Sequence, residues 1–174
     1  NYYPQISAAI QQFSQNNLTN THIRMAVVGV PLQLEGKCGV VSDFKNVTDF
    51  IPVADSLSTM RLPFNDEPTL DCPYLAATLS PPVNLSFRPM AERLFIMFTD
   101  EAAQSYLNPT ISPGTVTSAL NGMRARLFVF TVESVGETYR PIALGSGGQL
   151  FNLRETSVTL ESTLGTLLNS VICR

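Results

Sequence analysis

The feature that most constrains the fold is an uninterrupted apolar run that stops at two acidic residues. Residues 92–101 read ERLFIMFTDE, so apolar and hydroxyl side chains continue from Leu94 to Thr99 and lead directly into Asp100 and Glu101. A strand that is apolar on both faces is typical of a parallel sheet covered by helices. Such sheets bind ligands beyond the carboxyl ends of their strands. Asp100 is therefore the first candidate for a functional residue.

The rest of the chain alternates between helical and strand patterns. Helices are predicted over 6–15, 46–60, 67–79, 111–123 and 157–172, and strands over 23–30, 38–44, 93–100, 125–133 and 139–153. We expect Pro52 to break the second helix, Pro73 to kink the third, and the fourth to start near Thr115. The last helix should turn these side chains inward: Val158, Leu160, Leu164, Leu167, Leu168 and Val171. This order predicts one α/β domain over 1–174, doubly wound, with a mainly parallel sheet and helices on both faces.

Composition excludes two classes of partner. The net charge is −3, only 14% of residues are charged, and Lys and Arg are scattered, so we expect no nucleic acid. Apolar runs fall far short of the roughly 20 residues that cross a bilayer, so we expect no membrane span. His22 is the only histidine, and GSGGQ (145–149) fits neither a nucleophile elbow nor a dinucleotide fingerprint, so we expect no enzyme.

The cysteines and glycosylation patterns bear on the compartment. Cys38, Cys72 and Cys173 form no CxxC pair, so zinc is not expected. Cys38 and Cys72 either form a disulfide or leave Cys72 as a buried free thiol. Low Lys and abundant Ser, Thr and Asn favour an exported protein. The N-glycosylation pattern occurs at three positions: Asn17, Asn46 and Asn84.

Three segments, in order, carry a family resemblance. RLFIMFTDE (93–101), ARLFVFTV (125–132) and PIALGSGGQLFNL (141–153) resemble the fourth, the fifth and the last strand of a von Willebrand factor type A domain. The resemblance extends over nearly the whole chain. It implies a secreted or cell-surface adhesion module that binds a protein ligand through a Mg²⁺ ion at the strand ends.

The resemblance also implies metal-binding residues. Asp100 matches the acid that the family's fourth strand contributes to the metal site, and the family adds a threonine from the loop before its third helix. Here that loop is FNDEPTLD (64–71), where length favours Glu67, residue type favours Thr69, and Asp66 is close. Carboxylate, hydroxyl and water oxygens are the ligands that Mg²⁺ prefers. The structural alternatives are a helix-capping role for Asp100 and placement of the two loop acids near a helix N-terminus.

The family's central first strand, which ends in Asp-x-Ser-x-Ser, has no counterpart in residues 1–174. ADSLSTM (54–60) has the wrong spacing and follows no apolar strand. An empty strand position would leave backbone groups unpaired, at about 1–3 kcal/mol for each buried group. A cleaved N-terminal piece, a strand from another polypeptide, or a rearranged fold would each resolve this.

We therefore predict an additional parallel strand between the strands of 23–30 and 93–100. Cys173 is expected to form a disulfide with the polypeptide that bears this strand, or to stay free because that polypeptide has no cysteine. Two functions follow. The first is a metal-dependent adhesion module, and the second is a structural subunit of a surface assembly or filament, completed by another polypeptide's strand and without functional metal.

Overall fold

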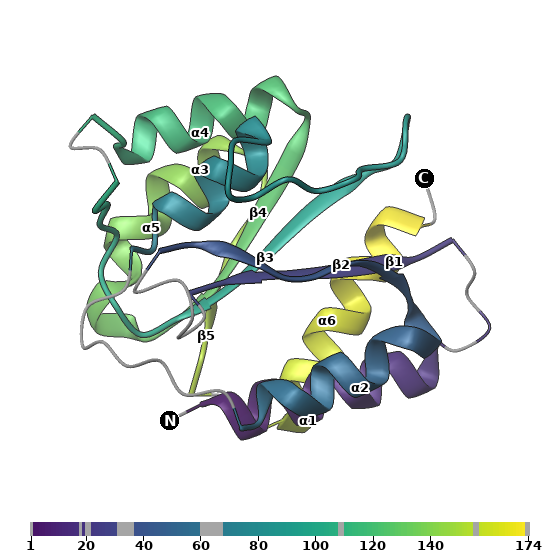
Figure 1. Cartoon of the computed structure of the whole chain (residues 1–174). Coiled ribbons are helices and arrows are strands. Elements are labelled where there is room, and N and C mark those ends of the chain that lie inside the picture. Colours follow the sequence, from purple (N-terminus) through teal and green to yellow (C-terminus); the bar gives the residue numbers. More distant parts are fainter. Residues whose placement is uncertain are drawn as a thin grey trace. The chain divides into compact units, whose positions relative to one another are not determined.

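The computed structural model describes residues 2–17, 19, 22–30, 37–59, 68–107, 110–154 and 157–172 (Figure 1). Contacts divide the α/β chain into two compact units: Asn1–Val27, Ser42–Arg61 and Arg154–Arg174 form the first, and Val28–Val41 and Leu62–Leu153 form the second. The single domain stays a prediction. The elements are α1 (Tyr3–Asn16), β1 (Arg24–Gly29), β2 (Gly39–Asn46), α2 (Val47–Leu57), α3 (Asp71–Thr78), β3 (Arg93–Thr99), α4 (Pro113–Gly122), β4 (Ala125–Thr131), α5 (Glu133–Gly145), β5 (Leu150–Asn152) and α6 (Ser157–Ile172).

A three-stranded parallel sheet, in the order β3-β4-β5, organises the second unit. Met97 of β3 lies opposite Val129 of β4, and Val129 lies opposite Leu150 of β5. β1 and β2 form a separate antiparallel pair. The predicted parallel sheet is thus confirmed for three strands, while the doubly wound arrangement and the additional strand stay predictions.

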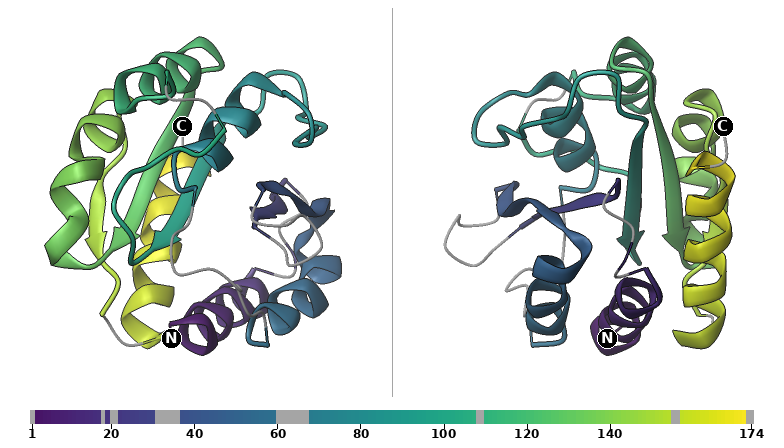
Figure 2. Two further views of the ribbon diagram at one scale, coloured as in Figure 1. Left: turned by 60° about the vertical axis from the view of Figure 1, so that its left-hand side comes forward. Right: turned by 90° about the vertical axis from the view of Figure 1, so that its right-hand side faces the viewer.

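The core of the second unit lies between the sheet and helices α3, α4 and α5 (Figure 2). Alternate side chains of β4 face these helices, because successive residues of a strand point to opposite faces. Fully buried residues of this cluster include Val116, Leu120, Val129, Tyr139 and Ile142. On the other face, a row of stacked rings crosses the three strands: Phe130 of β4 stacks at 5.0 Å on Phe98 of β3 and at 4.8 Å on Phe151 of β5.

The first unit contains helices α1, α2 and α6 together with parts of β1 and β2, and α1 contacts the other two helices. The hydroxyl of Ser7 donates to the backbone oxygen of Ala54 at 2.7 Å, which ties α1 to α2. Leu160, Leu164 and Leu167 are buried as predicted, whereas Val158 is 63% exposed and its predicted inward position is wrong. Val158 lies two residues before Leu160, about 200° around the helix, and so on the opposite face. Leu168 and Val171 lie outside the side chains that the structure describes.

The strand predicted over 139–153 is wrong for its first part, which belongs to α5. Tyr139, Ile142 and Ala143 are completely buried at a spacing of three and four residues, so burial on one helical face outweighs the cost of Pro141 inside the helix. Only Leu150–Asn152 forms the strand β5.

Of the other two prolines, Pro52 contradicts the prediction, and the kink expected at Pro73 stays a prediction. Pro52 lies inside α2 without breaking it. Because α3 begins at Asp71, later than predicted, Pro73 falls in its first turn, where a missing backbone N–H removes no helical hydrogen bond. In contrast, α4 begins earlier than predicted, at Pro113 instead of near Thr115.

A disulfide between Cys38 and Cys72 joins the residue before β2 to the first turn of α3, with a Cα–Cα distance of 5.3 Å. Of the two alternatives at Cys72, the structure therefore contains the disulfide. Cys173 lies outside the described residues. Within the part of the chain that the structure describes, no helix has both the length and the apolar character needed to cross a bilayer.

Candidate functional site

Asp100 begins a segment without helix or strand, residues 100–107, which we name the β3 loop. Its first backbone groups are held by side chains from the sheet and from α5. The amide of Glu101 donates to the hydroxyl of Thr99 at 3.1 Å, and the hydroxyl of Tyr139 donates to the backbone oxygen of Glu101 at 2.8 Å. The β3 loop therefore starts in a fixed direction from the carboxyl end of β3.

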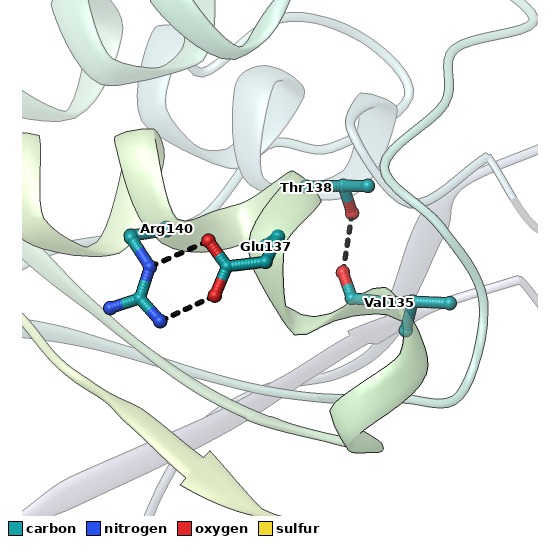
Figure 3. A network of polar contacts seen from close by, with 4 residues as sticks. All are labelled: Val135, Glu137, Thr138 and Arg140. Carbon is teal, nitrogen blue, oxygen red and sulfur yellow. Dashed lines mark hydrogen bonds and ion pairs between the residues drawn. The ribbon is translucent and has the colours of Figure 1, made fainter.

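The first turns of α5 hold the next part of the loop. The amide of Ala103 donates to the hydroxyl of Thr138 at 3.0 Å. That hydroxyl donates to the backbone oxygen of Val135 at 2.8 Å (Figure 3). Beside them, Arg140 donates two hydrogen bonds to the Glu137 carboxylate, which lower the pKa of Glu137 (Figure 3). Because Thr138 is itself anchored, its oxygen is oriented to accept from the loop.

Thr69, immediately before α3, holds the middle of the loop. Its hydroxyl donates to the backbone oxygen of Ala102 at 3.0 Å and accepts from the amide of Gln104 at 3.1 Å. The amide of Leu70 donates to the backbone oxygen of Gln104 at 2.9 Å. Thr69 is buried, with 4% exposure, so its hydroxyl serves mainly as a link between the α3 end and the β3 loop.

Asp71, the first residue of α3, holds the end of the loop. Its carboxylate is buried, with the residue 1% exposed, and it accepts from the hydroxyl of Ser105 and from the amides of Tyr106 and Leu107, each amide at 3.1 Å. A buried carboxylate is tolerated only with such donors around it, and hydrogen bonds to a charged acceptor are stronger than neutral ones. Sequence reasoning missed Asp71, as it missed Thr138 and Tyr139.

The sequence carries only a faint signal for Asp71. An acid at the start of an apolar helical pattern ordinarily indicates a favourable charge at a helix N-terminus, with the side chain in solvent. The burial of Asp71 depends on the arrival of residues 105–107, more than thirty positions later in the chain. Such a contact cannot be read from local spacing.

Asp100 itself is exposed, and in the described part of the chain its carboxylate has no hydrogen bond or ion pair. The structural alternative, a helix cap, does not apply, because the next helix in the described residues is α4, whose cap is Ser112. Glu101 is partly buried and contributes its backbone to the loop. The loop thus presents two carboxylates without a hydrogen bond or ion pair in the described residues, and of these Asp100 is the exposed one.

The metal-binding residues implied by the resemblance are only partly placed. Thr69 binds the loop that Asp100 begins, but its hydroxyl is already engaged with two backbone groups. Glu67 and Asp66 lie outside the described residues. Across the described ranges, no three His, Cys, Asp or Glu side chains are grouped closely enough to hold a metal ion. Among the described candidates, Asp100 offers an exposed carboxylate, whereas the Thr69 hydroxyl is buried and keeps one lone pair.

The three glycosylation candidates differ in their surroundings. Asn17 donates from its side chain to the backbone oxygen of Phe13 at 2.9 Å, at the end of α1. Asn46 caps α2 by accepting from the amide of Asp49 at 2.8 Å. Asn84 is exposed in a segment without helix or strand, between the buried residues Val83 and Leu85. A glycan on Asn84 would disturb neither a helix end nor the core, and modification itself stays a prediction.

A scan against models of known protein families finds no match to this chain, and a search of curated proteins finds no significant relative. The resemblance to von Willebrand factor type A domains therefore stays a prediction. The features that support a function for this chain are the geometry of the β3 loop and the chemistry of its side chains.

Proposed function

We propose that this chain is a non-enzymatic ligand-binding module of the adhesion type, whose binding face is the β3 loop. The observation that carries the proposal is an exposed, uncompensated carboxylate, Asp100, on a loop whose backbone is fixed by Thr69, Asp71, Thr138 and Tyr139. Loops on a rigid scaffold commonly carry binding residues. A fixed loop also loses little conformational freedom when it binds.

A divalent cation, Mg²⁺ or a similar ion, is the proposed partner of Asp100. Hard cations take carboxylate oxygens together with several waters, so an exposed carboxylate at a strand end is suitable. Asp100 would contribute its oxygen directly or through water, with Glu67 or Thr69 as the second candidate from this chain. An acidic group of a protein ligand would then complete the coordination of the ion.

Calorimetric titration with Mg²⁺ and Mn²⁺ tests the role of Asp100. The expected result is that Asp100→Ala weakens cation binding by about tenfold or more, because the charged oxygen ligand is lost. Asp43→Ala, which removes an exposed acid on β2, is the matched control and should bind as wild type does. Equal cation affinity in wild type and Asp100→Ala would remove Asp100 from the site.

A second function, that of a structural subunit completed by another polypeptide's strand, is favoured by a separate observation. β3 has five consecutive apolar residues, Leu94–Phe98, yet within the described residues it pairs only with β4. Its residues up to Phe98 are only partly buried, whereas those of β4 are nearly all buried. An apolar edge strand is a template for another strand.

Amide hydrogen exchange tests this second function. In the isolated chain, alternate amides of β3 should exchange rapidly, because a strand paired on one side leaves every second N–H unpaired. In the assembly purified from its source, the same amides should be protected. Protection of all β3 amides in the isolated chain, or no change on assembly, would count against strand addition.

Location outside the cell is part of the proposal. The disulfide between Cys38 and Cys72 supports it, because disulfides persist mainly in oxidising compartments. A secreted or cell-surface position would also make glycosylation at Asn84 possible. Peptide mapping of the native protein under non-reducing conditions would reveal the disulfide, any glycan, and the state of Cys173.

A further inference from the structure

The geometry points to Tyr106 and Leu107 as preformed apolar anchors that contact a protein ligand, with Asp71 as the residue that positions them. This inference rests on the proposed binding function of the β3 loop and deepens it. It names the kind of partner and the side chains that meet it.

Exposure of the two side chains combines with fixation of their backbone. Tyr106 is 58% exposed and Leu107 is 43% exposed, and they are adjacent in the chain. Their amides both donate to the same Asp71 oxygen, Oδ2, at 3.1 Å. On a mobile loop, two exposed apolar side chains would have to be ordered before they could bind a ligand. On a fixed loop they form a ready contact surface, since less conformational entropy is lost on binding.

The chemistry of the anchors indicates a protein partner. Tyrosine is enriched among the residues that dominate protein interfaces, because a rigid ring buries a large area at a small entropy cost. An adjacent leucine widens the apolar contact. The ligand is therefore expected to offer an apolar pocket that accepts the two side chains.

Charge defines the border of that pocket. The β3 loop carries Asp100 and Glu101, and residues 94–123 contain no Lys, Arg or His at all. A loop surface with acidic and no basic residues is best complemented by Lys or Arg around the pocket of the ligand. These opposite charges also steer the association of the two molecules. We therefore commit to a polypeptide ligand in which basic residues flank apolar ones, with one acidic group left to reach the cation proposed at Asp100.

A displayed library of random 12-residue peptides, selected on the immobilised full chain, tests the inference. The enriched peptides should carry Lys or Arg beside aromatic or aliphatic residues. Their affinity should fall about tenfold or more in Tyr106→Ala, and measurably in Leu107→Ala. Leu144→Ala, which truncates a 56% exposed leucine at the far end of α5, is the matched control and should bind as wild type does.

The positioning role of Asp71 has its own readout. Asp71→Asn keeps both anchors but weakens the acceptor of their amides, so peptide affinity should fall while the anchors stay chemically intact. Ser105→Ala removes one donor and leaves both amide bonds, and it provides a milder variant if Asp71→Asn folds poorly. Its affinity should lie between those of wild type and Asp71→Asn.

Two results would overturn the inference: a library that yields no binder, or binders whose affinity is unchanged in Tyr106→Ala and Leu107→Ala. Failure of the proposed cation role gives a different result, which is equal cation affinity of wild type and Asp100→Ala in calorimetry. Peptide binding that depends on Tyr106 but needs no cation would keep this inference and reject the metal. Cation binding that depends on Asp100, with peptides indifferent to Tyr106, would do the reverse.

Discussion

Asp71 illustrates how one buried carboxylate orders a loop far along the chain. It accepts from three donors of residues 105–107 while it begins α3 beside the disulfide at Cys72. The free energy of such an arrangement comes from charge-assisted hydrogen bonds that offset the burial of the charge. Asp71 can order residues 105–107 because it lies at the start of α3, next to these residues, and not because of its charge alone.

Replacement of Asp71 by alanine should therefore destabilise the fold. The three donors would lose their common acceptor, and the free energy of unfolding should fall by about 2–4 kcal/mol. Urea denaturation followed by circular dichroism measures this change. Asp43→Ala, an exposed acid, should stay within about 0.5 kcal/mol of wild type. A loss of that small size in Asp71→Ala would contradict a supporting role.

Gly148 is a second residue that packing dictates. A Cβ at this position would lie 1.8 Å from the backbone oxygen of Leu127, and the amide of Gly148 donates to the backbone oxygen of Ala143 at 2.8 Å. Gly148→Ala must therefore push α5 and β4 apart, and we expect a loss of more than about 3 kcal/mol in unfolding free energy. Gly165→Ala is the matched control, because no atom outside its own helix lies within 4 Å of its added Cβ, and it should be neutral or slightly stabilising.

The exposed pair Glu137–Arg140 has a predictable pH dependence. The hydrogen bond from Arg140 lowers the pKa of Glu137 below its ordinary value of 4.5. The contribution of the pair is thus present above pH 4.5 and is lost as the pH falls through the lowered pKa. An NMR titration of Glu137 should show this lowered pKa, and Arg140→Gln should return it towards the ordinary value. An identical titration in both proteins would exclude the pair in solution.

At the scale of elements, the disulfide fixes the start of α3, and with it Thr69 and Asp71. It closes a separation of 34 residues, so its removal in Cys38→Ala/Cys72→Ala should lower the unfolding free energy by about 2–4 kcal/mol. Urea denaturation of the double variant measures the loss. A non-reducing peptide map of the wild type with both thiols free would contradict the disulfide.

Most elements could be predicted from periodicity, and the exceptions have physical causes. β3 and β4 follow from continuous apolar runs, and α6 from its leucine spacing. The helix α5 could not be predicted, because Pro141 and the glycines indicate a turn. The burial of Tyr139 and Ile142 against the sheet nevertheless stabilises a helix. Local propensity was overridden by packing, which the sequence does not display.

The candidate site could be predicted only in part. Asp100 follows from its position after an apolar strand, because α/β sheets place ligands beyond the carboxyl ends of their strands. Thr69 was singled out as a metal ligand, and the structure adds its hydrogen bonds to residues 102 and 104. Asp71, Thr138 and Tyr139 could not be foreseen, since their roles arise from contacts across 30 residues or more.

At the scale of the whole molecule, the proposed binding depends on one property, the rigidity of the β3 loop. Residues 101–107 have no regular secondary structure, yet their backbone is bonded to side chains from β3, the start of α3, and α5. Proteins usually leave such connections mobile, and mobility lowers affinity through the entropy of ordering. The proposed cation role of Asp100 and the proposed anchors both require that this loop is already formed before a ligand arrives.

Residue-resolved amide hydrogen exchange by NMR tests this property most directly. The amides of Ala103, Gln104, Tyr106 and Leu107 each donate to a side-chain oxygen, so they should exchange at least about 100-fold more slowly than the amide of the 97% exposed Met90.

Asp71→Asn should accelerate exchange at Tyr106 and Leu107 and leave Val129, whose amide donates to the backbone oxygen of Gln149 in the sheet, unchanged. Exchange of the four loop amides in wild type at the rate of Met90 would contradict a preformed binding face.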